Sequence, residues 1–161
     1  MTLLSRRSIV LGGLSIAIAG CSTVAPSKNG RIASTKDVTA EALPYVNNLR
    51  QKNGLAPLTI HPAAVSAAIH QAERMVEYQK MGHLLGIGDS FFNRMKSGDV
   101  PLPAAENVAT GQQTVASVMD AWTKSKNHYD NMIGNFGSLG VAVAYDAAAN
   151  NRPYWAMILC R

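Results

Sequence analysis

The amino-acid sequence predicts an α+β fold, because two kinds of apolar pattern follow one another along the chain. From residue 38 to about residue 133, apolar residues recur mainly at helical spacing. Residues 139–145 and 154–160 are instead short runs of β-branched, aromatic and other apolar residues, which are typical of strands. Helices followed by strands indicate the α+β class. The chain has 161 residues, which suits one domain preceded by a targeting segment.

The first expected helix covers residues 37–53. Its apolar side chains fall at close to helical spacing, at Val38, Ala42, Val46 and Leu49. Gly54 supplies a stop at the C-terminal end. Pro44 interrupts the pattern, so the helix either kinks there or begins only near Leu43.

The second expected helix covers residues 62–81 and has the longest apolar stripe. Pro62 suits the first turn of a helix. The stripe consists of Val65, Ala68, Ile69, Ala72, Met75, Val76 and Gln79. His61 precedes this helix and His70 lies beside charged residues on it, so both are interpreted as solvated rather than as metal ligands.

Shorter elements are expected in the middle of the chain. Residues 89–96 form a helix that turns three apolar side chains inward, namely Phe91, Phe92 and Met95. Residues 99–105 contain two prolines and form a loop, and residues 106–110 form a short strand or extended segment. Thr114 is expected to cap a further helix. The apolar face of that helix carries Val115, Val118, Met119 and Trp122.

The C-terminal part is expected to be mainly β-structure. Residues 129–133 add one or two turns of helix before it. Residues 139–145 and 154–160 then form neighbouring antiparallel strands, joined by the turn D-A-A-A-N-N-R. Residues 57–60 form a further short extended piece.

The N-terminus resembles a bacterial lipoprotein signal over residues 1–20. Arg6 and Arg7 precede an apolar run over residues 9–19, which is too short for a membrane span of about 20 residues. The sequence Ile18-Ala19-Gly20-Cys21 matches a lipobox, which implies cleavage before Cys21 and acylation of its sulfur and amino group. The arginine pair also resembles a twin-arginine export signal. An ordinary secretory signal with a coincidental cysteine is the alternative.

The lipoprotein interpretation sets the domain boundaries and the expected location. The lipidated Cys21 and a small, polar, flexible tether occupy residues 21–36, and the folded domain occupies residues 37–161. We expect an extracytoplasmic protein anchored to the cell envelope. Ser22 favours the outer membrane in a Gram-negative host. Cys160 is expected to be a small buried hydrophobe, although an unlipidated Cys21 could form a disulfide with it.

The charge distribution gives little support for nucleic-acid binding. Of 15 Lys and Arg residues, only Arg6 and Arg7 belong to the signal, and the rest are scattered against 10 Asp and Glu. The sequence has no basic run and no interleaving of basic with aromatic residues. The mild positive charge is compatible with weak attraction to an anionic membrane.

One set of residues has the side chains that a metal site or an acid/base pair needs: His83, Glu106 and His128. They lie more than twenty positions apart, so their spacing is no local metal signature. Taken singly, each could be a surface or structural residue. Glu106 and Asn107 could also bridge a loop through hydrogen bonds to the backbone.

The order of motifs along the chain resembles the bacterial branch of the CAP superfamily, also called the SCP domain, over residues 40–160. This superfamily contains cysteine-rich secretory proteins, antigen 5 and plant pathogenesis-related proteins. The resemblance rests on Asn47, Arg50, Gly54, Pro57 and Leu58, on Ala67, Ala68 and Met75, on His83 and Arg94, on Ala105-Glu106-Asn107-Val108-Ala109 with Gly111, on Trp122, Ser125, His128 and Asn131, and on Leu139-Gly140-Val141 with Tyr154-Trp155.

The resemblance implies an α-β-α sandwich, with a small antiparallel sheet between helical layers and a central cavity. In relatives with the full set, two histidines and two acids line this cavity and can hold zinc or another divalent cation. His83, Glu106 and His128 match three of the four. The second acid is missing, because Lys124 and Ser125 stand in that neighbourhood. Glu106 could be a third ligand, a group behind the ligands or a base. Asn107 and Ser125 are expected to shape the cavity, and Trp122 belongs to the core.

Two functions follow from these expectations. The first is a membrane-tethered module that binds a lipid, a small molecule or an envelope protein without turnover. The incomplete set of acids and the absence of a recognisable nucleophile with its base favour it. The alternative is a metal-assisted hydrolase of peptide or cell-wall material, with water on zinc and Glu106 as the candidate general base. A purely structural envelope protein is a third possibility.

Overall fold

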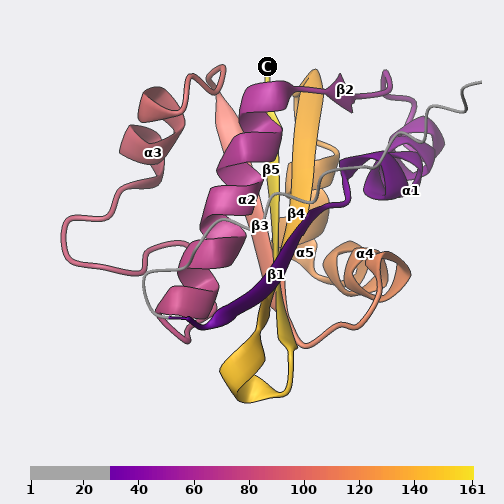
Figure 1. Cartoon of the computed structure of the whole chain (residues 1–161). Coiled ribbons are helices and arrows are strands. Elements are labelled where there is room, and N and C mark those ends of the chain that lie inside the picture. The colour runs from indigo at the N-terminus through magenta and orange to yellow at the C-terminus, as the bar shows by residue number, and fades with distance from the viewer. Residues whose placement is uncertain (1–29) are drawn as a thin grey trace, which may run out of the picture.

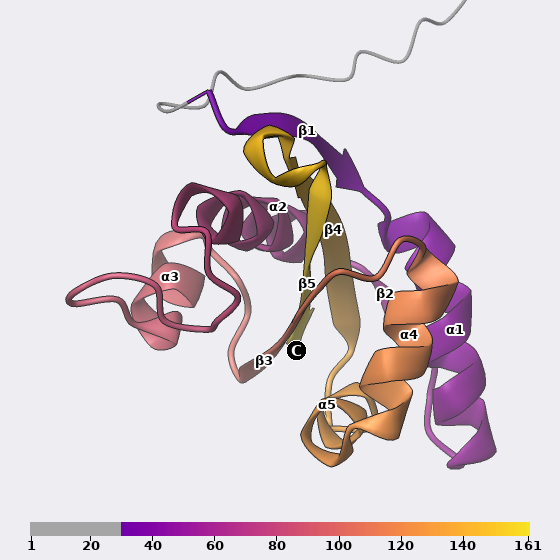
Figure 2. The same ribbon diagram turned by 90° about the horizontal axis from the view of Figure 1, so that it is seen from below.

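A twisted sheet lies between two layers of helices in the computed structural model, which describes residues 30–161 (Figures 1 and 2). On one face lie α2 (Pro62–Glu77) and α3 (Phe91–Ser97). On the other lie α1 (Thr39–Lys52), α4 (Val115–Lys124) and α5 (Lys126–Met132). This arrangement confirms the α+β class and the α-β-α sandwich.

The sheet has two long central strands, which form a hairpin. They are β4 (Ser138–Asp146) and β5 (Arg152–Cys160), joined by a short 3₁₀ turn over Ala147–Ala149. Both strands are almost wholly buried, because helices cover both faces of the sheet at its centre. Their near-continuous apolar composition reflects this two-sided burial. The predicted hairpin is confirmed.

Three further strands complete the sheet, which is antiparallel apart from one short pairing. They are β1 (Ile32–Asp37), β2 (Thr59–Ile60) and β3 (Ala104–Thr110). The order across the sheet is β1-β4-β5-β3, and β2 pairs parallel with the start of β4. β3 therefore pairs on one side only, with β5, and forms an edge of the sheet.

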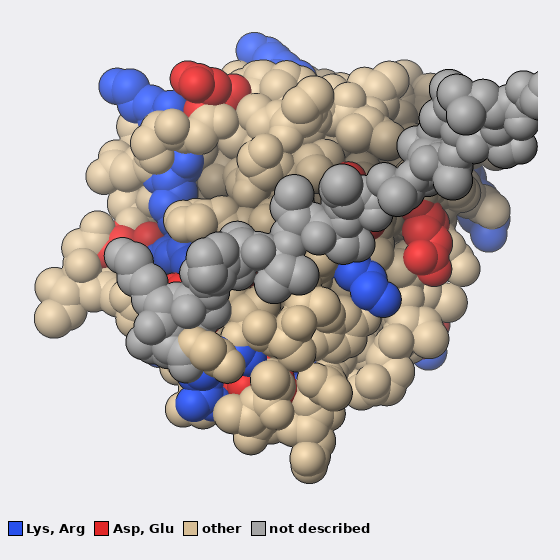
Figure 3. All heavy atoms as spheres, in the orientation of Figure 1, with Lys and Arg blue, Asp and Glu red and all other residues tan. Residues whose placement is uncertain are grey.

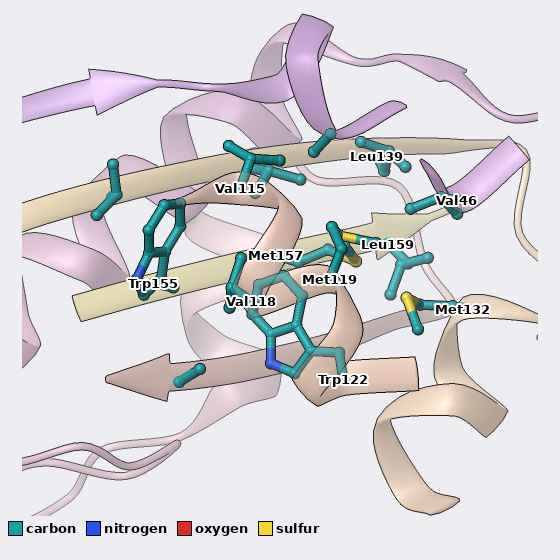
Figure 4. Close-up of a cluster of buried hydrophobic side chains, with 14 of the residues drawn as sticks. Val46, Val115, Val118, Met119, Trp122, Met132, Leu139, Trp155, Met157 and Leu159 are labelled. Carbon is teal, nitrogen blue, oxygen red and sulfur yellow. The ribbon is translucent and has the colours of Figure 1, made fainter. Parts of the chain in front are cut away.

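The core between the sheet and the layer of α1, α4 and α5 is built around large side chains (Figure 4). Trp122 of α4 is 1% exposed and packs with residues from the sheet, including Met157 and Leu159. The indole nitrogen of Trp122 donates to the carbonyl of Val108 at 3.3 Å. The predicted core role of Trp122 is confirmed.

The core between the sheet and α2 depends on small side chains. Ala64, Ala68 and Ala72 of α2 are fully buried against it. Gly140 of β4 lies directly beneath the helix, and a Cβ atom there would stand 2.2 Å from the backbone nitrogen of Val65. α2 can therefore approach the sheet this closely only over a residue without a side chain.

The domain begins earlier than predicted. The flexible tether expected over residues 21–36 is wrong in its last part, because Ile32–Asp37 forms β1 and pairs with β4. This segment has no clear apolar alternation, so its pairing comes from the ladder of backbone hydrogen bonds. The predicted signal over residues 1–20, the lipidated Cys21 and the first part of the tether lie outside the described residues.

Several helix boundaries and orientations differ from the predictions. α1 begins at Thr39 and continues through Pro44. α2 ends at Glu77, before the predicted end at residue 81, and the chain continues as a loop. Phe92 of α3 is exposed rather than turned inward, whereas Met95 is buried as predicted. A seven-residue helix can direct only part of its surface to the core.

Other predictions about the ends of the chain's elements are confirmed. Thr114 caps α4, with its hydroxyl accepting from the amide of Ser117 at 3.1 Å. Cys160 is a buried free thiol, and burial raises its pKa. Within residues 30–161, no helix has the length and apolar content required to cross a lipid bilayer.

Candidate functional site

His83 and Glu106 form the central contact of the candidate site. Glu106 Oε1 lies 2.9 Å from His83 Nδ1. The Glu106 side chain is 2% exposed, whereas that of His83 is 52% exposed. Donation from Nδ1 to the carboxylate leaves Nε2 of His83 as the ring nitrogen available to another partner. The predicted pair is therefore brought together, with the carboxylate behind the imidazole.

Arg94 of α3 holds the other side of the Glu106 carboxylate. Its Nη1 lies 3.1 Å from Oε2, and its Nη2 lies 3.3 Å from Oε1. Nη2 also donates to the backbone carbonyl of His83 at 2.9 Å. The guanidinium therefore neutralises a buried carboxylate and fixes the loop that carries His83.

Asp89 extends this network into the loop between α2 and α3. Its carboxylate accepts from Arg94 Nε at 3.2 Å, from Arg74 of α2, and from the backbone amide of Leu85 at 2.8 Å. Burial of Asp89 acts to raise the pKa of its carboxyl, but these hydrogen bonds and the two arginine charges outweigh burial and lower the pKa. Asp89 therefore remains ionised and ties the loop to both helices.

On the other face of β3, the Asn107 side chain holds the backbone of α5 in place. Its side-chain amide donates to the carbonyl of His128 at 3.0 Å, and its side-chain oxygen accepts from Asn131 at 2.8 Å. Asn107 is fully buried. It therefore fixes the backbone at His128 in α5, while its expected part in shaping a cavity stays a prediction.

The adjacent positions of Glu106 and Asn107 explain how one strand serves two layers. Successive side chains of a strand point to opposite faces of the sheet. Glu106 accordingly meets His83 and Arg94 on the side of α2 and α3, and Asn107 meets α5 on the other side. Figure 2 shows β3 between these helical layers. Since β3 is an edge strand, no further strand separates the layers there in the described part of the chain.

His128 lies in the same region as His83. Burial lowers the pKa of His128, and the charge of nearby His83 lowers it further. The His128 ring also faces the Trp122 indole, with a centroid distance of 6.5 Å and a tilt of 58°. His128 is therefore held mainly as the neutral imidazole near pH 7, the form that accepts a hydrogen bond or binds a metal.

Ser125 contributes through its backbone. It stands at the junction of α4 and α5, and its amide donates to the carbonyl of Trp122 at 3.3 Å. The amide of Tyr129 donates to the Ser125 carbonyl at 2.8 Å. The Ser125 hydroxyl makes no capping hydrogen bond to α5. Ser125 therefore sets the turn that brings His128 to the site, while its side chain does not fasten it.

The donors can be compared with the needs of a divalent metal ion. Within residues 30–161, no group of three or more His, Cys, Asp or Glu side chains is arranged to hold an ion. Glu106 supports His83 from behind, as carboxylates do for metal-binding histidines. His83 and His128 are the two side chains that could serve as ligands, with Glu106 behind His83. The expected zinc or other divalent cation stays a prediction.

Sequence reasoning missed the partners that organise His83. Arg94 belongs to the resemblance, but its contacts to Glu106 and Asp89 could not be read from the sequence. Asp89 was overlooked, although it is the one acidic residue between Glu77 and Asp99. A single acid in a segment rich in apolar residues is a usable signal for a buried ion pair.

Two surface features surround the site. A hollow of about 300 Å³ lies between α2 and α3 beside Arg94. It is lined by Ser66, Ala67, His70, Arg94, Met95, Ser97 and Gly98. On the face shown in Figure 3, Lys and Arg lie scattered among Asp and Glu without a large basic patch.

Comparison with solved structures gives the same fold. An outer surface protein from Borrelia burgdorferi superimposes with a TM-score of 0.64 at 21% identity, covering 77% of this chain and 96% of that one. An extracellular protein containing a SCP domain from Bacillus anthracis gives a TM-score of 0.66 at 19% identity, covering 76% of this chain and 39% of that one.

Comparison of sequences adds the family. The chain is 35% identical over 97 residues to the uncharacterized protein YkwD of Bacillus subtilis, which covers 59% of this chain and 38% of the relative. The chain thus spans under two fifths of that relative's length. Residues 43–160 match the model of the cysteine-rich secretory protein family, CAP. With its sandwich fold and this match over most of its length, the chain belongs to the CAP family.

Proposed function

We propose that this protein is an extracytoplasmic CAP-domain lipoprotein, tethered to the membrane through Cys21, which binds a ligand or envelope partner at His83 and His128. One observation carries the proposal. The half-exposed imidazole of His83 is backed by a buried carboxylate whose two oxygens are both engaged, by His83 and by Arg94. Such a site presents a fixed nitrogen to a ligand and has no free carboxylate oxygen beside it.

The proposed location rests on separate support. The lipobox at Cys21 implies acyl anchoring, and residues 30–161 offer no membrane-spanning helix in its place. The relatives with this fold include one named as an outer surface protein and one named as extracellular. These names support an extracytoplasmic location for this chain.

A divalent cation such as zinc is a candidate occupant of the site. His83 and His128 would hold it, and Glu106 would orient His83 through Nδ1. The bound ion would act as a Lewis acid that recruits an anionic or carbonyl group of the ligand. With only two protein ligands, we expect affinity weaker than that of a structural zinc site.

The alternative of a metal-assisted hydrolase has less support from the geometry. A general base must accept a proton from water or substrate with a free atom. Both oxygens of Glu106 are already hydrogen-bonded, so the candidate base is committed to a structural role in this conformation.

Zinc titration of the mature chain tests the proposal. The chain from residue 21, with Cys21→Ser to prevent acylation, is titrated with Zn²⁺ by calorimetry and by imidazole NMR. We expect binding that His83→Ala or His128→Ala weakens about tenfold or more, while His70→Ala, an exposed histidine of α2, leaves it unchanged.

The competing functions have distinct signatures in the same preparation. Equal loss of zinc binding in His70→Ala would remove the support for a specific site. Hydrolysis of casein or peptidoglycan that Glu106→Gln abolishes, without a loss of folding by circular dichroism, would replace the binding module with a hydrolase.

A further inference from the structure

We propose that the loop between α2 and α3, taken with the first residues of α3 as residues 78–92, is a second membrane contact that inserts apolar side chains into the surface of an anionic lipid bilayer. The proposal rests on the proposed anchoring at Cys21 for its orientation. The loop's own lipid affinity follows from its exposed side chains.

Exposed apolar side chains are concentrated in this loop. Nine large hydrophobic residues are exposed in the described part of the chain, and five fall within these fifteen positions. Each of the five exposes 47% or more of its surface: Tyr78, Met81, Leu84, Ile87 and Phe92. Single exposed hydrophobic residues are ordinary, whereas a cluster of this kind marks a contact surface.

The structure holds these side chains outward. Gln71 of the buried α2 face donates to the carbonyl of Gly82 at 2.8 Å, and the Leu85 amide donates to Asp89. Leu85 is buried in the core, so the loop is fastened at that residue. Its neighbours Leu84 and Ile87 remain exposed. The loop is thus fixed at its base, and it cannot fold back onto the domain to bury these apolar side chains.

The charge of the loop suits anionic headgroups. Between residues 78 and 92 the charged side chains are Lys80, which is exposed, and Asp89, which is buried and paired with two arginines. The accessible charge of the loop is therefore positive. Figure 3 shows the corresponding protrusion, at the left edge of the view, with uncharged residues at its tip. Apolar side chains beside a lysine are the combination that binds at a membrane interface.

The chain enters the domain at Arg31, close to the base of this loop. An anchor at Cys21 would therefore hold the loop near the membrane. The guanidinium of Arg31 lies beside the side-chain amide of Gln79 at the base of the loop, and Arg31 pairs with Asp146 at 3.2 Å. Figure 1 shows β1 starting beside the end of α2. Only nine residues, 22–30, separate Cys21 from Arg31, a span of about 35 Å at most. An anchor at Cys21 therefore keeps the loop within reach of the bilayer.

Vesicle binding without the anchor tests the loop separately. The mature chain with Cys21→Ser is sedimented with vesicles of phosphatidylethanolamine and phosphatidylglycerol at a ratio of about three to one, a composition that supplies the anionic charge. We expect Leu84→Ser with Ile87→Ser to lower partitioning about tenfold or more. Ile60→Ser in β2, a comparably exposed apolar residue, is the matched control and should leave partitioning unchanged.

A fluorescent reporter records insertion directly. Trp122 and Trp155 are buried, so Leu84→Trp adds the exposed indole. Its emission should shift to the blue with these vesicles and shift less when phosphatidylglycerol is omitted or salt is raised.

Three outcomes would overturn the proposal: no sedimentation of the parent chain, an equal loss in Ile60→Ser, or a dimer in solution that the Leu84 and Ile87 substitutions dissociate. The last would assign the loop to self-association. Acylation of Cys21 is measured by mass spectrometry of the wild-type chain, so failure of the anchor is distinguished from failure of the loop.

Discussion

At the scale of single residues, the site depends on a buried ion network more than on the histidines that it displays. Glu106 and Asp89 are both almost wholly buried, and Arg94 contacts both. A buried charge that loses its partner keeps its desolvation cost without compensation. The free energy of unfolding should therefore respond strongly to changes at Arg94.

Replacing Arg94 by methionine tests this dependence. We expect Arg94→Met to lower the free energy of unfolding by about 3–5 kcal/mol, because Glu106 loses its cationic partner in the interior. Urea denaturation of the mature chain measures the effect. The matched control is Lys124→Met, which removes the exposed pair of Lys124 with Asp120 on α4 and should cost about 0.5 kcal/mol or less. Similar costs for the two changes would contradict the assigned role of Arg94.

His128 should make the fold sensitive to mild acid. Burial and the charge of His83 lower the pKa of His128 below the value of about 6.5 expected for the unfolded chain. The unfolded state then binds more protons as pH falls through 6.5, so acidification removes stability that is present above that pH. The measurement is the midpoint of thermal unfolding at pH 7.5 and at pH 5.

Two variants in that experiment separate the contribution of His128 to the pH dependence of stability from that of His70. His128→Gln should reduce the loss of stability between the two pH values. The pKa of His70 is also lowered, by partial burial and then by the charge of Arg74, so His70→Gln removes a second contribution of the same sign. An unchanged pH dependence in His128→Gln would show that this imidazole is not held neutral by the fold.

Sequence reasoning found the residues of the site but could not find their pairing. His83, Glu106 and His128 could be selected as the side chains with suitable chemistry, and their order matched a family. The contact of Glu106 with His83 spans 23 positions and depends on a loop whose path is set by Asp89. Local periodicity carries no information about such a path. The bidentate contact of Arg94 was hidden for the same reason.

At the scale of elements, the packing of α2 on β4 brings the backbones of a helix and a strand close together. The axis of α2 lies over Gly140, and the helix turns its buried alanines toward the sheet. Small residues on both partners allow the two backbones to approach. The position of α2 then fixes the start of the loop that carries His83.

A methyl group at Gly140 should displace α2. We expect Gly140→Ala to lower the free energy of unfolding by about 3 kcal/mol or more, because the added Cβ would overlap backbone atoms that cannot rotate away. Gly137→Ala is the matched control, since a Cβ there finds its nearest neighbouring atom at 3.6 Å. Chemical denaturation of both variants measures the difference. Equal effects would mean that the helix can shift without cost.

The elements that periodicity predicts well are those with one buried face. α2 and α4 carry regular apolar stripes, and both were expected at nearly their observed positions. β1 was missed because Ile32–Asp37 has few apolar residues, and its stability comes from pairing with a strand more than a hundred positions away. Phe92 was misplaced because apolar character alone does not decide which face of a short helix is buried.

At the scale of the whole molecule, the sheet acts as a partition between two cores. The succession of helical and strand patterns predicted the α+β class, while the sandwich was implied by the family resemblance. Neither the helical pattern nor the strand pattern could show that α2 and α4 lie on opposite faces of the sheet. The assignment depends on how β3, β4 and β5 are ordered, and β3 reaches the edge only through a long crossover.

The anchored arrangement predicts where the intact protein is found. After a high-salt wash, Cys21→Ser should move the mature chain from the membrane fraction to the soluble fraction, because the proposed acyl chains at Cys21 would supply most of the membrane affinity. Mass spectrometry of the N-terminal peptide measures acylation in the wild type. Cys160→Ser is the control, since this buried thiol takes no part in anchoring. Retention of the Cys21→Ser chain after a high-salt wash would contradict acyl anchoring as the main attachment.

The early start of the domain at β1 has a mechanical consequence for an anchored chain. If the proposed anchor at Cys21 and a bound partner were pulled apart, tension would enter through Arg31 and reach the ladder of β1 with β4 before either core. The Arg31–Asp146 pair would carry that load first. Separation of the six residues of β1 from β4 would lengthen the connection to the proposed anchor by about 20 Å while both cores stay closed, so this edge strand would serve as an extensible link between the membrane and the proposed binding site.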